Sequence, residues 1–296
     1  MEEQKNIEQY YQKARRKAKT NIVWFAIFSI VMLFAGLTSA YIVSKGDNFW
    51  VSFSMPSALW ISTAFILLSS ITMILAVKSA KKSKNKQTTL LLTITLALGL
   101  LFAGSQYYAW TQLYDKGYAW AEKIYNRETG EIMLDGEYGV DYTLDFQGKE
   151  LLLEPDGFYF MGQQAIKIDR EEYNQFKAEQ PERALGKPFV RVQENKKNPN
   201  KTILEVVVMA KMALPPTYEE KLKTVGNVSS SYFYVLTILH LAHIFVALFY
   251  LLGMVFLSAK KDLTEDNQLK IKLGGYFWHF FAGLWVYLLL FLFLIH

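Results

Sequence analysis

Five long stretches of this sequence contain no Asp, Glu, Lys or Arg, and they limit the possible folds more than any other feature. An α-helix rises about 1.5 Å per residue, so about 20 apolar residues cross a hydrocarbon layer about 30 Å thick. Each stretch is long enough, and a soluble core seldom holds helices so apolar over such a length. The sequence predicts an all-α polytopic membrane bundle with transmembrane helices in Ile22–Ser44, Ser57–Val77, Gln87–Tyr114, Val228–Ala259 and Leu273–His296.

Basic residues gather at one set of ends of these spans. Six Lys or Arg lie in residues 1–21, five in 78–86 and four in 258–272, whereas the short loop 45–56 holds one. Cytoplasmic flanks are enriched in Lys and Arg. This pattern predicts a cytoplasmic N-terminus and a C-terminus on the opposite side. It also explains the net charge of +5 without a nucleic-acid partner.

A polar insert separates the third and fourth spans. Residues 115–227 carry 20 acidic and 16 basic side chains. Short alternating runs such as "YTLDFQ", "FVRVQ" and "TILEVVVMAKM" are typical of strands, while "DREEYNQFKAEQ" predicts one helix. We therefore expect a small β-rich extracytoplasmic domain. The predicted organisation is a basic segment 1–21, spans 22–114, the insert 115–227 and spans 228–296.

The chain lacks the side chains for several kinds of chemistry. It contains no cysteine, which excludes disulfides, thiolate catalysis, iron–sulfur clusters and thiolate copper sites. The spans hold no carboxylate, Lys or Arg, and proton pumps and ion-coupled transporters usually place such groups at membrane depth. The sequence thus argues against an independent proton path and against a carboxylate di-metal site.

Two histidines, His240 and His243, stand one turn apart in the fourth span, on one helix face with Phe233, Thr237 and Ala247. One interpretation is a haem or metal site that these histidines form with His279. Two ligands on the same face of one helix cannot clamp a single haem, so that interpretation leaves one histidine unexplained.

The other interpretation is hydrogen bonding between helices, and we favour it. Small residues beside these polar groups, such as Gly99 near Gln106 and Gly275 near His279, would allow close helix approach. The sequence predicts no catalytic residue. The predicted polar cross-links are His240, His243, His279, Gln106, Thr237, Tyr234 and Trp278.

Two motifs near the C-terminus resemble a known family. "FYVLTILHLAHIFVA" is similar to the penultimate helix of subunit III of haem–copper terminal oxidases, with its aromatic pair, Leu/Thr and two histidines. "YFWHFFAGLWVYLLLF" is similar to the last helix, with Trp278, His279 and Trp285. The first three spans resemble the preceding helices in order, including Ser69–Ser70 and the spacing of Gly99, Phe102 and Gln106. The resemblance is to the five-helix bacterial form, with an added insert.

The chain departs from that family at carboxylates that its members carry within the membrane. The matching positions are Ile30, Ala282 and Tyr108. Any role that relatives give to those acids does not transfer to this chain.

The resemblance implies a non-catalytic subunit of a complex that reduces oxygen to water and pumps protons. Haems and copper would lie in partner subunits. Four histidines are too few for subunit I, and the absence of cysteine rules out the dinuclear copper of subunit II. The family's roles are packing on subunit I, binding structural phospholipid, and supporting proton uptake and complex stability. The implied location is the bacterial inner membrane, with the insert and C-terminus in the periplasm.

Two other functions stay open at this point. The chain would be a membrane haem or metal protein if His240, His243 and His279 act as ligands, or a membrane-anchored receptor if the outer domain does the work. The insert, acidic by four charges, would also suit docking of a cytochrome c domain or a neighbouring respiratory complex.

Overall fold

The computed structural model describes residues 2–47, 49–120, 123–124, 126, 132–154, 157–169, 171, 189–193, 203–260 and 263–295. Five of its helices are long and apolar enough to cross a membrane, which confirms the predicted bundle. They are α1 (Glu2–Asp47), α2 (Ala58–Lys81), α3 (Asn85–Asp115), α6 (Val228–Lys260) and α7 (Glu265–Ile295).

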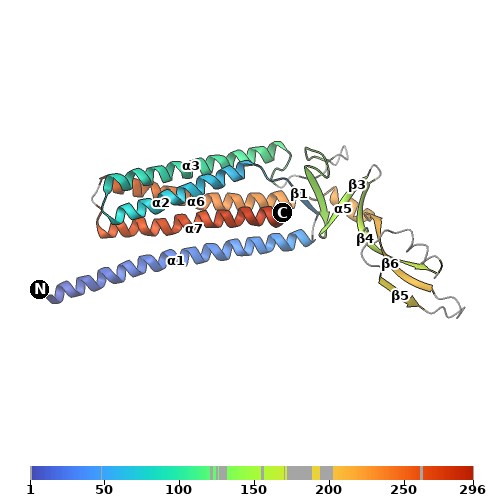
Figure 1. Ribbon diagram of the computed structural model, residues 1–296, viewed down its shortest axis with the longest axis horizontal. Coiled ribbons are helices and arrows are strands. Elements are labelled where there is room, and N and C mark those ends of the chain that lie inside the picture. Colours follow the sequence, from blue (N-terminus) through green and yellow to red (C-terminus); the bar gives the residue numbers. More distant parts are fainter. Residues whose placement is uncertain are drawn as a thin grey trace.

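The first helix stands apart from the other four. In Figure 1, α2, α3, α6 and α7 pack as a bundle, while α1 diverges from them toward its N-terminus. Only 17% of the most apolar window of α1 is buried, against 50% for α7. The helix also begins well before the apolar run at Ile22, so the basic segment and the first span form one continuous helix. Most of the apolar surface of α1 is therefore not covered by the other four helices.

Short connections fix the neighbours within the bundle. The turn between α2 and α3 uses Lys82, Ser83 and Lys84, and Ser83 adopts a left-handed φ of 52°. Two backbone N–H groups of this turn, those of Lys82 and Lys84, donate to the carbonyl of Ser79. So tight a connection makes α2 and α3 antiparallel neighbours. It also places residues 78–86 at the same end of the molecule as the N-terminus (Figure 1).

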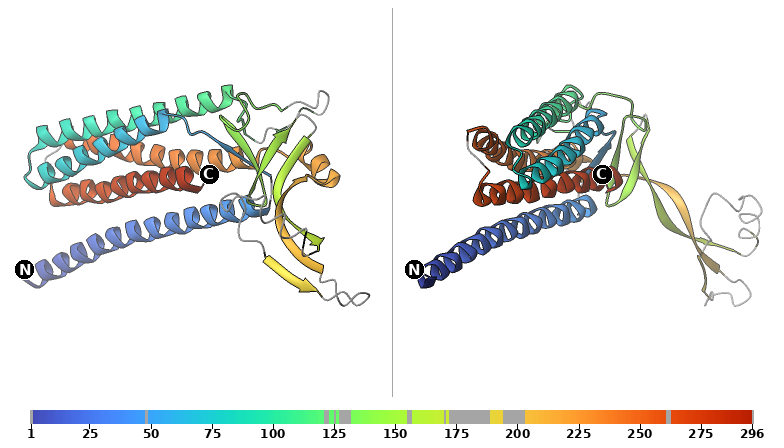
Figure 2. Two further views of the ribbon diagram at one scale, coloured as in Figure 1. Left: turned by 45° about the vertical axis from the view of Figure 1, so that its right-hand side comes forward. Right: turned by 60° about the vertical axis from the view of Figure 1, so that its left-hand side comes forward.

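The other end of the bundle carries a six-stranded antiparallel sheet with the order β1-β2-β3-β4-β6-β5 (Figures 1 and 2). Most predicted strands are found near their expected positions, and a short helix, α5 (Pro216–Leu222), follows the last of them. The predicted helix in 169–180 lies almost entirely outside the described residues. The strands are β1 (Phe49–Phe53), β2 (Tyr142–Phe146), β3 (Lys149–Glu154), β4 (Gly157–Ile168), β5 (Phe189–Gln193) and β6 (Ile203–Ala213).

One strand comes from outside the predicted insert. β1 belongs to the short loop between α1 and α2, and it pairs with β2 from Phe49–Phe146 to Phe53–Tyr142. Its apolar side chains are buried, with Phe49 stacked on Phe146 at 4.6 Å between ring centroids. The outer sheet is therefore built from two separate parts of the sequence, and 115–227 is not a self-contained strand set.

The start of α6 joins the sheet to the bundle. Asn227 caps the helix, because its side-chain oxygen accepts the N–H of Ser230 at 3.1 Å. The hydroxyls of the next two serines reach other elements: that of Ser229 donates to the carbonyl of Val51 on β1, and that of Ser230 to Ala119 after α3. These bonds fix the sheet against the outer end of the helices.

Candidate functional site

The fully buried histidine of α6 joins two helices. Nε2 of His240 lies 3.1 Å from the carbonyl oxygen of Phe281 on α7. A carbonyl oxygen can only accept, so Nε2 carries the proton and donates. The imidazole ring is enclosed by Phe102, Phe281 and Trp285, with centroid distances of 5.9, 6.5 and 5.3 Å. His240 thus pairs with backbone, at a site that no side-chain pattern could indicate.

The second histidine of α6 is placed differently. Nδ1 of His243 donates to the carbonyl of Leu239 on its own helix at 2.7 Å. Its contacts with other helices are between rings, to Phe34 of α1 and Phe281 of α7, each at 5.9 Å. His243 is therefore held by packing and by its own helix, whereas the sequence predicted a polar cross-link.

Hydroxyl side chains of α2 form a polar seam against α3 and α7. Ser69 accepts the indole N–H of Trp278 at 2.9 Å, and Ser70 bonds Nδ1 of His279 at 2.6 Å. Ser62 accepts an amide N–H of Gln106 at 2.8 Å, and Thr63 accepts the indole N–H of Trp285 at 2.9 Å. Every one of these bonds joins α2 to another helix.

The predicted polar cross-links do not include the serine and threonine hydroxyls of this seam. A signal was present, because Ser62–Thr63 and Ser69–Ser70 stand seven residues apart and so share one helix face.

The remaining predicted cross-links join α3 to α6. Thr237 accepts the indole N–H of Trp110 at 3.1 Å, and the hydroxyl of Tyr234 donates to the carbonyl of Trp110 at 3.4 Å. The three membrane histidines make separate hydrogen bonds rather than converging. Among the described residues, no group of three or more His, Cys, Asp or Glu side chains could hold a metal ion.

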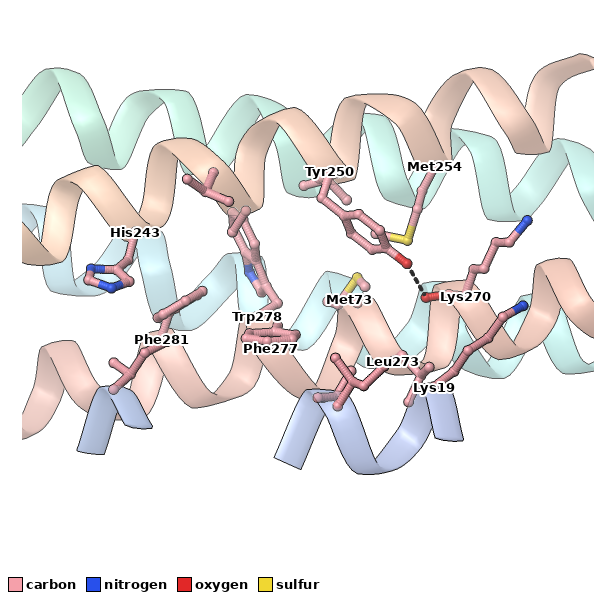
Figure 3. Close-up of a pocket in the computed structure, with 17 residues that line it drawn as sticks. Lys19, Met73, His243, Tyr250, Met254, Lys270, Leu273, Phe277, Trp278 and Phe281 are labelled. Carbon is pink, nitrogen blue, oxygen red and sulfur yellow. Dashed lines mark hydrogen bonds between the residues drawn. The ribbon is translucent and has the colours of Figure 1, made fainter. Parts of the chain in front are cut away.

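A cavity of about 420 Å³ lies along the space between α1, α6 and α7. Its walls are almost entirely apolar, with Phe277, Trp278 and Phe281 from α7 among them. Figure 3 shows His243 at one end of the cavity and the ammonium groups of Lys19 and Lys270 at the other. The cavity is therefore an apolar groove with a cationic mouth.

Ion pairs cross the mouth of this cavity and tie α1 to α7. Lys19 and Lys270 bond the two oxygens of Asp266, at 2.6 and 3.2 Å, and Arg16 pairs with Glu265. Two ammonium groups share the single carboxylate of Asp266, so one positive charge remains at the mouth. We call this group of five side chains the mouth cluster.

The geometry defines a polytopic membrane bundle whose polar groups bind other helices, with an outer sheet attached. The family model for cytochrome c oxidase subunit III matches residues 192–295. That stretch contains α6 and α7, and the resemblance recognised from the two C-terminal motifs is confirmed there. Among curated proteins, none matches the chain.

Proposed function

We propose that this chain is the non-catalytic subunit III of a proton-pumping haem–copper terminal oxidase in aerobic respiration. In this role it packs on subunit I, holds phospholipid and supports proton uptake and stability of the complex. It is thus an accessory part of an oxygen-reducing oxidoreductase whose haems and copper are held by partner subunits. The family match of residues 192–295 is the observation that carries this proposal.

The arrangement of the polar groups supports an accessory role. Histidine, Gln and Trp side chains in the described spans hydrogen-bond hydroxyls or backbone carbonyls. Side chains occupied in this way brace helices, and they supply neither an open metal site nor a titrating carboxylate at membrane depth.

Co-purification tests the proposal directly. A tagged chain, isolated in mild detergent from its own membranes, should bring with it a haem–copper subunit I and the oxidase spectrum. The chain separated from its partners should carry no haem. Isolation of the chain alone with stoichiometric haem would instead favour the haem-protein hypothesis based on His240, His243 and His279.

We further propose that the cavity between α1, α6 and α7 holds an acyl chain of an anionic phospholipid. Its apolar walls suit hydrocarbon, and the positive mouth suits a phosphate group at the membrane surface. Lys19→Gln combined with Lys270→Gln should lower the anionic lipid retained by the purified complex. Lys82→Gln, at the same end but outside the cavity lining, is the control. Equal anionic lipid in all three preparations would contradict this assignment.

The topology that goes with this function places the N-terminus in the cytoplasm and the sheet in the periplasm of a bacterial inner membrane. Support comes from the fifteen Lys and Arg in residues 1–21, 78–86 and 258–272 of the sequence. Because the chain has no cysteine, single-cysteine variants give unambiguous labelling. Glu150→Cys on β3 should react with an impermeant thiol reagent in whole cells whose outer membrane has been permeabilised. Lys82→Cys should react only after the inner membrane is opened.

The outer sheet supports a second proposal, that it docks a neighbouring respiratory complex or a cytochrome c domain. It projects beyond the bundle in both views of Figure 2. The insert that supplies most of its strands carries four more acidic than basic residues. An acidic surface steers basic partners toward it.

A further inference from the structure

Two buried hydrogen-bond acceptors lie on the neighbouring helices α3 and α6. They are Oε1 of Gln106 on α3 and Nδ1 of His240 on α6, in side chains that are 1% and 0% exposed. Among the residues that the structure describes, no donor lies within hydrogen-bonding distance of either atom. Folded proteins satisfy nearly all such atoms with protein groups or with ordered water, so the pair requires a donor.

The hydrogen bonds that the two side chains already make show that each remaining atom is an acceptor. His240 donates from Nε2 to the carbonyl of Phe281, which leaves an unprotonated Nδ1. Gln106 donates from its amide nitrogen to Ser62, which leaves the amide oxygen. Both free atoms are therefore acceptors, and neither can satisfy the other.

Neighbouring side chains supply no donor either. Phe102 and Phe281 have none, and the indole N–H of Trp285 is already given to Thr63 at 2.9 Å. The hydroxyl of Ser62 donates to the carbonyl of Leu59 at 2.7 Å. The N–H and O–H groups of these neighbouring side chains thus donate to other acceptors.

The register of α3 and α6 places the two acceptors at the same depth. The two helices run antiparallel, and the indole of Trp110 bonds Thr237. Gln106 lies one turn before Trp110, and His240 lies one turn after Thr237, so both are displaced in the same direction from that bond. The ring of His240 also lies 5.9 Å from that of Phe102, which is one turn before Gln106 on α3.

We propose that one water molecule binds between Gln106 and His240. Its two O–H groups satisfy Oε1 and Nδ1, since a water molecule can donate to two acceptors at once. The result is a continuous chain of hydrogen bonds from Leu59 through Ser62, Gln106, the water and His240 to Phe281. It links α2, α3, α6 and α7. The inference is independent of the function proposed above.

The first test is a map of the intact membrane complex at a resolution that shows ordered water. Density within hydrogen-bonding distance of both Oε1 of Gln106 and Nδ1 of His240 is expected. Empty space between them would overturn the proposal. So would a rotated Gln106 amide that donates directly to His240.

A double-mutant cycle gives a second test that does not need such a map. Gln106→Met and His240→Phe each remove one acceptor and release the water, so the double variant loses it only once. The drop in Tm of the double variant should be smaller than the sum of the two single drops. Gln106→Met combined with Trp278→Phe, which lose unrelated bonds, should be additive. Additive effects in the first pair would refute the bridge, and if the variants fail to assemble the density alone decides.

Discussion

Imidazole is tolerated inside hydrocarbon when its N–H group reaches a carbonyl oxygen, and the histidines of α6 achieve this in two ways. His240 donates across to α7, whereas His243 donates within its own helix. Replacing each histidine in turn therefore compares a hydrogen bond between helices with one inside a helix. The difference in stability between the two variants measures what the bond between helices contributes.

His240→Leu should destabilise the complex by roughly 1–3 kcal/mol, because it removes a hydrogen bond between α6 and α7 from a fully buried side chain. His243→Leu should cost less, since the hydrogen bond that it removes lies within α6 and joins no second helix. Thermal unfolding of the purified complex measures both. The haem spectrum should be unchanged in each variant, and its loss in His240→Leu would contradict a bracing role.

A partly buried tyrosine in the outer sheet leads us to expect that alkali destabilises this domain. Tyr138 donates to the carbonyl of Leu151 and accepts the N–H of Leu144. Burial raises the pKa of Tyr138 from 10.0 to about 12. A folded-state pKa above the unfolded one means that the stabilisation is complete below pH 10 and is lost as the pH rises toward 12.

Tyr138→Phe should therefore lower stability at pH 8, by about 1 kcal/mol for the lost hydrogen bonds, and flatten the loss of stability between pH 10 and 12. Burial also raises the pKa values of Tyr118 and Tyr142. Both remain in the variant, so the difference between the two pH profiles isolates Tyr138. Parallel profiles would show that its hydroxyl ionises without effect.

Packing of α3 against its neighbours depends on one glycine. A Cβ added at Gly99 would lie 2.7 Å from Cη2 of Trp278 and 2.8 Å from Cδ2 of Leu248. Gly104, five residues further along α3, has nothing within 4 Å of the same position. Substituting alanine at each glycine thus distinguishes two effects on stability. At Gly99 the new methyl group meets neighbouring side chains, whereas at Gly104 it changes only the helix propensity.

Gly99→Ala should destabilise the complex by about 1–3 kcal/mol through overpacking. Gly104→Ala should be neutral or slightly stabilising, because alanine favours the helix. Denaturation of both variants under identical detergent conditions measures the difference. Equal effects would mean that Trp278 and Leu248 move aside without cost.

The mouth cluster holds α1 to the start of α7 by charge. Its side chains are partly exposed, from 29% for Lys19 to 77% for Glu265, and pairs of this kind contribute about 0–1 kcal/mol. Asp266→Asn should lower the Tm slightly at low salt. Since ions screen exposed charges, the variant and parent should converge near 1 M salt. A deficit that persists at high salt would point to lost packing rather than lost charge.

Patterns along the chain predict helices well here and predict their partners poorly. Length and lack of charge are enough to locate five spans, since hydrocarbon forces every backbone group to pair within its own helix. Which side chains form hydrogen bonds between helices depends instead on how each helix is rotated about its axis and how deep it lies in the membrane. The partner of His240 is a carbonyl, a group that every residue possesses, and the partners of Trp278 and His279 are serines. Only the hydroxyl spacing on α2 offered a signal for them.

The arrangement of sheet and bundle shows a second limit of sequence patterns. Alternation identified the strands of the insert, but β1 lies a long way from β2 in the chain, and its run "FWVSF" is too short to signal a partner. Because β1 is covered by β2, deleting all of 115–227 would expose Phe49, Val51 and Phe53 as well as removing the insert. A test of the outer domain must leave that pair intact.

Strand pairing permits a truncation that separates assembly from docking. Gly162 on β4 lies opposite Ala210 on β6, so an Asn-Gly turn between them would close a hairpin and remove residues 163–209. The bundle, β1 to β3 and the Asn227 cap remain. The shortened chain should still co-purify with the oxidase and support oxygen reduction from an artificial donor. If the removed strands dock a neighbouring complex or a cytochrome c domain, co-migration on a native gel should fall several-fold. Unchanged co-migration would exclude docking through these strands, because nothing else on the outer face has been altered.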